Sequence, residues 1–239
     1  MIRLYRDAGA WGLPSVSPFG LKLETWLRMA DLPYEIREAN PLRAPTGKIP
    51  YIELNGEHIG DSQLIIERLT RQFEVLLDEG MSPGDRATAR LVRRTLEEAT
   101  YFNLVTDRWL TDDGYAMVFK AFTPFFPPLV RNLAIPAVRR TVRNQAYAQG
   151  AGRHAPETSV AMAIEDWEAI ALVMGDRPYL LGDVPRSVDA TVYAFLAQIL
   201  VPPRESAMKR ALESKPALAA YHQRMHDRYF PQATLLPEP

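Results

Sequence analysis

The spacing of apolar residues near the start of the chain alternates between the period of a strand and the period of a helix. Residues 2–6 predict one strand, and residues 34–38 predict another. Between them, residues 18–31 carry apolar side chains that share one helix face: Phe19, Leu23, Trp26, Leu27 and Ala30. We therefore expect strand, helix and strand in that order.

A hairpin is expected after a long connection. Residues 51–54 and 57–60 are separated by Asn55 and Gly56, and Asn-Gly is the strongest two-residue signal for a hairpin turn. Pro50 cannot donate a ladder hydrogen bond. The strand that follows Pro50 is therefore predicted to begin at an edge of the sheet.

A helix is predicted over residues 62–73, and beyond it the strand signals stop. A linker leads to a helix start near Pro83, since proline suits the first turn of a helix. Helical patterns then continue, with breaks at stretches rich in proline and glycine. We therefore expect an α/β domain over residues 1–75 and an all-α domain over residues 83–239.

Composition narrows the classes of function. The chain has 239 residues, 47% hydrophobic and 24% charged, and its net charge of −1 does not favour a nucleic-acid partner. It has no cysteine, which excludes disulfides, thiolate metal sites and a cysteine nucleophile. No apolar run approaches the roughly 20 residues of a membrane helix, so we expect a soluble, cytoplasmic protein.

Residues 114–156 contain no acidic residue. Their cations are Lys120, Arg131, Arg139, Arg140, Arg143 and Arg153. The simplest interpretation is a solvated basic face on two helices. The functional alternatives are a ligand pocket and contact with a membrane surface, of which we favour the pocket.

Aromatic residues at helical spacing lie in and just before this segment: Trp109, Tyr115, Phe119 and Phe122. This pattern is typical of a helical core. The same side chains are candidates for lining a pocket that binds an apolar electrophile.

Ser17 precedes Pro18 at the start of the first predicted helix. Serine is a preferred N-cap and proline a preferred first residue, so a cap is the simplest interpretation. A hydroxyl at the positive end of a helix can also donate a hydrogen bond to an incoming thiolate and lower the pKa of that thiol. Ser15 is a second candidate hydroxyl.

Asp61 and Ser62 open the helix that follows the hairpin. They predict either another N-cap or a helix N-terminus that binds a carboxylate, with Asp61 available to pair with an amine. An amino-acid-like ligand would use both features.

These features together resemble the glutathione transferase superfamily. The resemblance rests on the Ser-x-x helix start, "GKIP" at residues 47–50, the Asn-Gly hairpin and the Asp-Ser helix start. It implies a thioredoxin-like N-terminal domain followed by an all-helical C-terminal domain. "SVSPFGLKLETWLRMADLPYE" at residues 15–35 and "QGAGRH" at residues 149–154 are more specifically similar to the metaxin and failed-axon-connections branch.

The resemblance implies a role for each matching residue. Ser17 is implied to be the catalytic hydroxyl, and Pro50 is implied to be a cis-proline that follows the main-chain ligand Ile49. Lys48 is implied to reach the glycyl carboxylate of glutathione. Asp61 and Ser62 are implied to hold the γ-glutamyl end.

The function implied is an enzyme that conjugates glutathione, as co-substrate, to a small hydrophobic electrophile. A homodimer is implied as well. The alternative is a non-catalytic binding or assembly protein with the same fold, of the metaxin kind. The chain departs from the superfamily pattern at Arg186, which stands at the cap of a buried helix where Ser or Thr is usual. Asp189 is kept, and Ser187 is a candidate substitute for the cap.

His222 and His226 have the spacing of two zinc ligands on one helix. No third ligand is evident in the sequence. We expect a solvated helix face here and no metal site.

Overall fold

The computed structural model describes residues 1–40 and 43–231. Its first elements follow the predicted order: β1 (Ile2–Arg6), α1 (Pro18–Met29), β2 (Tyr34–Glu38), β3 (Tyr51–Leu54), β4 (Glu57–Gly60) and α2 (Ser62–Gln72). The strands lie in the order β2-β1-β3-β4, in which only the β1–β2 pair is parallel. The predicted thioredoxin-like sheet is therefore confirmed.

Strand β3 lies inside the sheet, so the prediction that it begins at an edge is wrong. Tyr51 pairs with Tyr5 of β1 on one side and with Gly60 of β4 on the other. Pro50 precedes the first of these pairs, so its missing N–H leaves no gap in the ladder. The proline marks the start of a strand and not the edge of the sheet.

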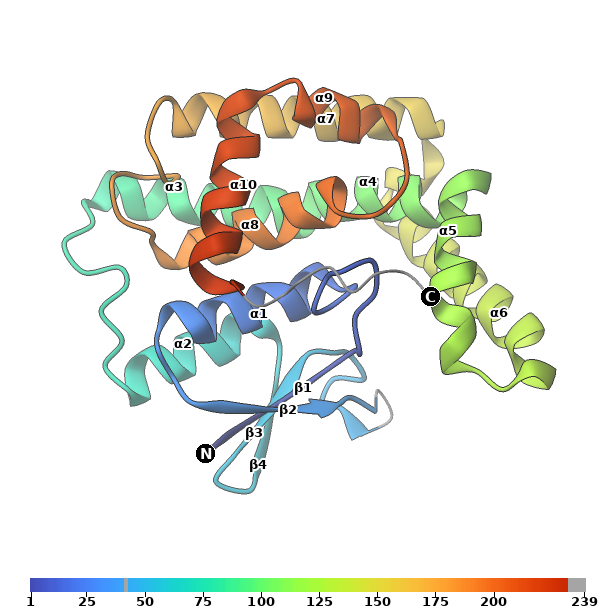
Figure 1. Ribbon diagram of the computed structural model, residues 1–239, viewed down its shortest axis with the longest axis horizontal. Helices are drawn as coiled ribbons and strands as arrows, with labels where there is room; N and C mark the ends of the chain where they lie inside the picture. Colours follow the sequence, from blue (N-terminus) through green and yellow to red (C-terminus); the bar gives the residue numbers. More distant parts are fainter. Residues whose placement is uncertain (41–42, 232–239) are drawn as a thin grey trace.

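Helix α1 is buried on almost every side because it lies between the sheet and helix α8 (Ser187–Leu200) (Figure 1). Its buried residues include the charged Lys22 and Glu24. The Glu24 carboxylate accepts hydrogen bonds from Arg6 Nε at 2.7 Å and from Arg28 Nη2 at 2.9 Å. The buried surface of α1 is thus wider than the single apolar face predicted from the sequence. Ion pairs compensate the charged side chains of α1 that are buried between the sheet and α8.

From Pro83 onward the described chain is helical. The helices and π-helical segments (η2, η3) are α3 (Pro83–Arg94), η2 (Thr95–Thr100), α4 (Tyr101–Val105), η3 (Thr106–Leu110), α5 (Asp112–Phe122), α6 (Pro128–Gln149), α7 (Pro156–Met174), α8, α9 (Ala207–Glu213) and α10 (Pro216–Tyr229). Each break predicted at a stretch rich in proline or glycine lies between two of these helices. Within the described ranges, no helix combines the length and the apolar character needed to cross a bilayer.

Helix α8 is the centre of the helical layer, with α1 on one side and α3, α9 and α10 around the rest (Figure 1). Asp189 in its first turn accepts hydrogen bonds from the N–H groups of Arg186 at 2.8 Å and Leu180 at 3.0 Å, and from the Tyr221 hydroxyl at 3.0 Å. Burial raises the pKa of Asp189 to about 6. The carboxylate therefore fixes the start of the helix to the loop before it and to α10.

Arg186 does not leave the start of α8 uncapped. The Arg186 guanidinium donates to the carbonyls of Leu77 at 3.0 Å and Glu79 at 2.7 Å. Asp78, in the same linker, accepts from the Ser187 N–H at 2.8 Å. The Ser187 hydroxyl accepts from Trp26 Nε1 at 3.2 Å, so it holds α1 and does not act as the substitute cap.

Candidate functional site

Ser15 and Ser17 precede α1, and the structure gives their hydroxyls different surroundings. Ser15 is fully buried, and its Oγ donates to Asp7 Oδ2 at 2.5 Å while it accepts from the Ser17 N–H at 3.2 Å. Ser17 is half-buried, and its Oγ accepts one long hydrogen bond from the Gly20 N–H at 3.5 Å. The Ser17 hydroxyl donates to no group among the described residues, so its hydrogen is available to a ligand.

Asp7 sets the path of the loop that carries Ser17. Its Oδ1 accepts from the N–H groups of Gly9 at 3.0 Å and Val16 at 2.7 Å. Gly9 has φ of 80°, and a Cβ there would lie 2.3 Å from the Leu13 carbonyl oxygen. Only glycine allows this turn, which brings the chain back to α1 with Ser17 at its N-cap.

Arg108 of η3 brings a buried positive charge to the same loop. Its guanidinium donates to the Val16 carbonyl at 3.1 Å and to Gln198 Oε1 at 2.9 Å. Burial lowers the pKa of Arg108 to about 10, so the group stays charged at neutral pH. A cation therefore lies one residue from Ser17, where it would favour an anion.

The Ile49–Pro50 peptide bond is cis, as the resemblance implies. Ile49 is half-buried and lies just ahead of β3. Its N–H and carbonyl find no hydrogen-bond partner in the part of the chain that the structure describes. Main-chain groups in this state can pair with an extended, peptide-like ligand. Lys48, one residue earlier, is exposed.

Asp61 is the N-cap of α2, and Ser62 is the first residue of that helix. Asp61 Oδ1 accepts from the N–H groups of Gln63 at 2.9 Å and Leu64 at 3.1 Å. Its backbone has φ of 69°, which is rare outside glycine and costs on the order of 1–3 kcal/mol. Capping a helix does not require a positive φ, so the unusual backbone of Asp61 suggests that this residue has a further role in binding a ligand.

Lys22 lies behind Ser62 and connects the starts of α1 and α2. Its side chain is 1% exposed, and its Nζ donates to Glu97 Oε1 at 2.5 Å, Gln63 Oε1 at 3.0 Å and Ser62 Oγ at 3.4 Å. Burial lowers the pKa of the Lys22 ammonium, and the Glu97 carboxylate opposes that shift. Because Lys22 donates to Ser62, the hydrogen of the Ser62 hydroxyl is left for an anion bound in front of it.

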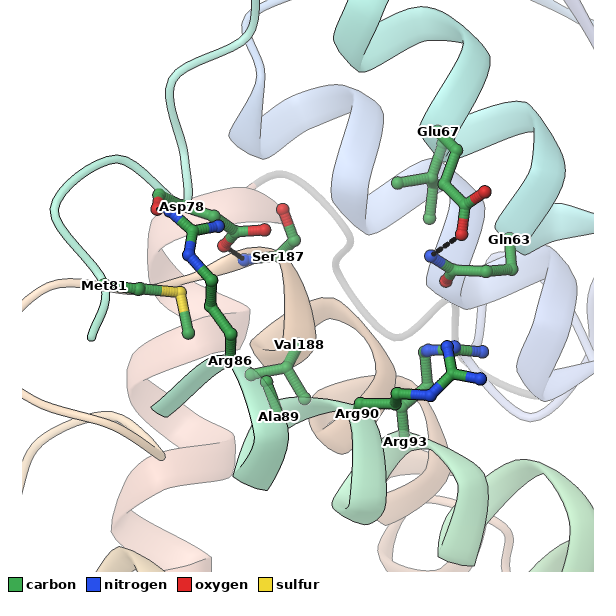
Figure 2. Close-up of a pocket in the computed structure, with 11 residues that line it drawn as sticks. Gln63, Glu67, Asp78, Met81, Arg86, Ala89, Arg90, Arg93, Ser187 and Val188 are labelled. Atoms are coloured by element: carbon green, nitrogen blue, oxygen red, sulfur yellow. Dashed lines mark hydrogen bonds between the residues drawn. The ribbon is translucent and has the colours of Figure 1, made fainter. Parts of the chain in front are cut away.

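A cavity of about 240 Å³ adjoins this network between α2, the linker, α3 and α8 (Figure 2). Arg90 and Arg93 of α3 point toward Gln63 and Glu67 of α2. Gln63 also accepts from Lys22, and Arg93 donates to Glu97 at 2.9 Å. Both ends of the Lys22–Glu97 pair are therefore adjacent to residues of the cavity wall.

Comparison with known proteins finds two family models that match the chain. The family model for the glutathione S-transferase N-terminal domain matches residues 18–114, and that for the C-terminal domain matches residues 163–225. An isoprene-epoxide--glutathione S-transferase of Rhodococcus sp. is 30% identical over 241 residues, covering 96% of this chain and 99% of its own. The chain belongs to the glutathione S-transferase family.

Other relatives place this transferase-family chain in the predicted branch. Failed axon connections of Drosophila melanogaster is 29% identical, covering 97% of this chain and 58% of its own. Metaxin-1 of Macaca fascicularis is 28% identical, covering 96% and 75%. The structure of glutathione S-transferase III in apo form has a TM-score of 0.63 at 16% identity, covering 100% of this chain and 98% of its own, and shows the shared fold.

Two residues beside the candidate site of this glutathione S-transferase family member were not predicted from the sequence: Lys22 and Arg108. Lys22 falls within an apolar helical pattern, and a buried lysine needs a partner, which here lies 75 residues away. Arg108 reaches Val16 across 92 residues. No local pattern reports contacts of this range, although Lys22 between Leu21 and Leu23 is an anomaly that the sequence shows.

Trp109 and Tyr115 are packed by other side chains of the helical domain. The Trp109 and Phe122 rings lie 5.6 Å apart, and the Tyr115 and Phe119 rings 6.0 Å apart. The Arg139 guanidinium lies 3.9 Å from the centre of the Tyr115 ring. These contacts are those of a helical core, and a role in binding an electrophile stays a prediction.

His222 and His226 have ring centres 6.4 Å apart. His222 is half-buried, its ring stacks on Tyr193 with centres 5.4 Å apart, and its Nε2 is buried, so it does not lie on the expected solvated face. No cluster of three or more potential metal ligands occurs among the described residues.

Proposed function

We propose that the chain is a glutathione transferase that adds the thiolate of glutathione to a small hydrophobic electrophile. An epoxide is the first class to test, because a relative that matches nearly the whole chain is named for an epoxide. In that reaction the sulfur bonds to a ring carbon, the carbon–oxygen bond of the ring breaks, and the resulting alkoxide takes a proton from water. The electrophile contributes the strained ring, and the protein contributes the thiolate.

The observation that carries this proposal is the free hydroxyl hydrogen of Ser17 at the positive end of α1. A free thiol such as that of glutathione has a pKa of about 8.5, so little is ionised at neutral pH. A hydrogen bond to a charged group contributes about 1.5–3 kcal/mol, which corresponds to a shift of roughly one to two pKa units. The buried Arg108 charge at Val16 acts in the same direction.

The rest of the site has groups suited to the rest of glutathione. The unpaired main chain of Ile49 fits the peptide-like middle of the ligand, and Lys48 fits its glycyl carboxylate. Ser62, with Lys22 behind it, fits the γ-glutamyl carboxylate. Asp61 fits the neighbouring amine, and the chain would work as a homodimer, as its family suggests.

A second candidate function is that of a non-catalytic binding or assembly protein. The similarity to metaxin-1 and Failed axon connections over nearly the whole chain favours it. The two functions differ in one observable, which is whether bound glutathione ionises more readily than free glutathione.

The decisive experiment is a titration of thiolate ultraviolet absorbance against pH for glutathione bound to the wild-type protein and to Ser17→Ala. The wild type should lower the pKa of the bound thiol by roughly one to two units, and Ser17→Ala should reverse most of that shift. Turnover at pH 7 should fall by about tenfold to a hundredfold, and the loss should shrink as pH rises because ionisation then needs no help.

Ser62→Ala is the matched control. It should weaken glutathione binding by about 1–3 kcal/mol in calorimetry while leaving the pKa of the bound thiol low. Identical titration curves for wild type and Ser17→Ala would remove Ser17 from the mechanism. Absence of any glutathione binding to the wild type would favour the assembly protein.

A further inference from the structure

Helix α6 presents an exposed side that mixes apolar and basic residues. Leu129 is 92% exposed, Leu133 77% and Tyr147 59%, and Arg140 and Arg143 are exposed as well. These residues are separated by 4, 7, 3 and 4 positions, so they share one side of the helix. We call this set of five residues the α6 outer face.

The opposite side of α6 holds the helix in place. Ile135 and Ala146 are buried, and Arg139 Nε donates to the Trp109 carbonyl at 2.9 Å. The Arg139 guanidinium also covers the Tyr115 ring. The orientation of α6 is thus fixed by contacts with η3 and α5, and the α6 outer face points away from the body of the protein.

The charge of this region is one-sided although the whole chain is nearly neutral. Residues 114–156 contain no acidic residue, whereas the chain carries a net charge of −1. Arg140 and Arg143 form no ion pair or hydrogen bond within the described part of the chain. Their guanidinium groups are therefore available to an external anionic surface.

The shape of the region favours a broad surface over a small ligand. Helices α5 and α6 form one end of the molecule in Figure 1, so the α6 outer face lies on a projection. Apolar residues with arginine and an aromatic residue on one helix side are the features by which a helix lies in a lipid–water interface.

We propose that the α6 outer face binds the surface of an anionic lipid membrane. This reverses the preference for a pocket in residues 114–156, because the leucines and arginines of this face are exposed on one side of the helix. Leu129, Leu133 and Tyr147 enter the interfacial layer, and Arg140 and Arg143 bind lipid phosphates. The α6 outer face includes none of the residues proposed to bind glutathione, so the two contacts use different side chains.

The test is sedimentation of the full chain with vesicles of phosphatidylcholine that contain about one third phosphatidylglycerol, at about 0.15 M salt. The wild type should bind these vesicles and bind pure phosphatidylcholine far less. The affinity of the double variant Leu129→Asp, Leu133→Asp for these vesicles should be lower than that of the wild type by about tenfold or more. The double variant Arg140→Gln, Arg143→Gln should lose about fivefold per arginine, and higher salt should weaken the wild type.

Leu172→Asp is the matched control, because Leu172 is an 83% exposed leucine on α7 that is not part of the α6 outer face. It should bind vesicles as the wild type does, and circular dichroism should show all variants folded. Failure of the wild type to sediment with anionic vesicles overturns the proposal, as does equal binding by the wild type and both double variants. A double leucine variant that changes only the size of the particle in chromatography would assign the face to contact between protein copies and also overturn it.

Discussion

Lys22 is an ammonium group removed from water and held by a carboxylate from the other domain. Burying an ion costs several kcal/mol, and a buried pair recovers that cost only when the geometry is good. Glu97 has two cations, Lys22 at 2.5 Å and Arg93 at 2.9 Å. If Lys22 is removed, Arg93 still compensates part of the Glu97 charge, whereas Ser62 loses the hydrogen bond that Lys22 donates to it.

Lys22→Met should lower both the free energy of unfolding and the affinity for glutathione. We expect a stability loss of about 3 kcal/mol, at the low end for a broken buried pair because Arg93 remains. Affinity should fall by about tenfold, because Ser62 loses the donor that orients its hydroxyl. Chemical denaturation and calorimetry measure the two effects separately.

The double variant Lys22→Met, Glu97→Met separates structure from binding. Stability should recover, since apolar replacement of both members of a buried pair is often neutral. The affinity for glutathione should stay low. Full recovery of affinity in the double variant would show that Lys22 supports only the fold.

His222 makes stability depend on pH. Burial, followed by the nearby His226, lowers the pKa of His222 to about 4 from its ordinary value of 6.5. His222 therefore becomes protonated below about pH 6.5 in the unfolded chain but only below about pH 4 in the folded chain. The free energy of unfolding should fall by about 3 kcal/mol on this account as pH drops from 6.5 to 4, with no contribution above that window.

His222→Phe keeps a ring against Tyr193 and removes the titrating group. The difference in unfolding free energy between wild type and variant should change by about 3 kcal/mol between pH 7 and pH 4, measured by urea denaturation. The difference is the quantity to follow because Asp189, with its pKa raised to about 6, acts in the opposite direction over an overlapping window. A difference that stays constant with pH would contradict the assignment to His222.

The segment from α3 to η3 is a continuous helical path with two π-helical segments, η2 and η3. Each inserts extra residues into a turn, and they place Glu97 against Lys22 and Arg108 against Val16. The path ends at Thr111, whose backbone is extended with ψ of 155°. The next helix turns back so closely that Gly114 lies against the last turn of η3.

Gly114→Ala should destabilise the protein by roughly 1–3 kcal/mol. Its Cβ would lie 2.5 Å from the Asp107 carbonyl oxygen and 2.7 Å from that of Arg108, and backbone atoms cannot move aside without shifting a helix. The midpoint of thermal unfolding measures the effect.

Gly84→Ala is the matched change on α3, where an added Cβ would meet only Ser82 Oγ at 3.7 Å. It should leave stability unchanged or raise it by about 0.5–1 kcal/mol, since alanine is the better helix former. Equal effects of the two substitutions would show that the close turn before α5 can relax.

At the scale of the whole molecule, hydrogen bonds and an ion pair, which two independent units would lack, join the two domains. Trp26 donates to Ser187, Arg186 binds the linker carbonyls, and the Lys22–Glu97 pair crosses between α1 and η2. Helix α1 has α8 as one of its two walls, so the sheet domain alone would expose much of that helix to water.

The protein should therefore unfold in one cooperative transition. Calorimetry should give equal calorimetric and van't Hoff enthalpies. Arg186→Met should lower the midpoint of the transition without splitting it, because only two of the contacts between the linker and α8 are lost. Two resolved transitions in the wild type would contradict this expectation.

The order of the elements could be predicted from the sequence, as could an α/β part followed by an all-helical part, because both depend on local signals. Asn55-Gly56 fixes a turn, Ser17-Pro18 starts a helix, and apolar spacing separates strands from helices. The central position of β3, the burial of Lys22 and the approach of Arg108 could not be predicted. Each of these depends on which distant segments pack together, and the two-residue period of strands and the 3.6-residue period of helices do not encode that.

Ser17 and Asp7 also differ in what their loss would do over evolutionary time. The Ser17 hydroxyl has a single 3.5 Å contact, so its replacement costs the fold about 1 kcal/mol, whereas Asp7 and Ser15 hold the loop by several short contacts. On the proposed function, one tolerated substitution at Ser17 would remove the reaction and leave the fold unchanged. Similarity along the whole chain therefore reports a shared fold among relatives, and it does not report whether a relative catalyses the reaction.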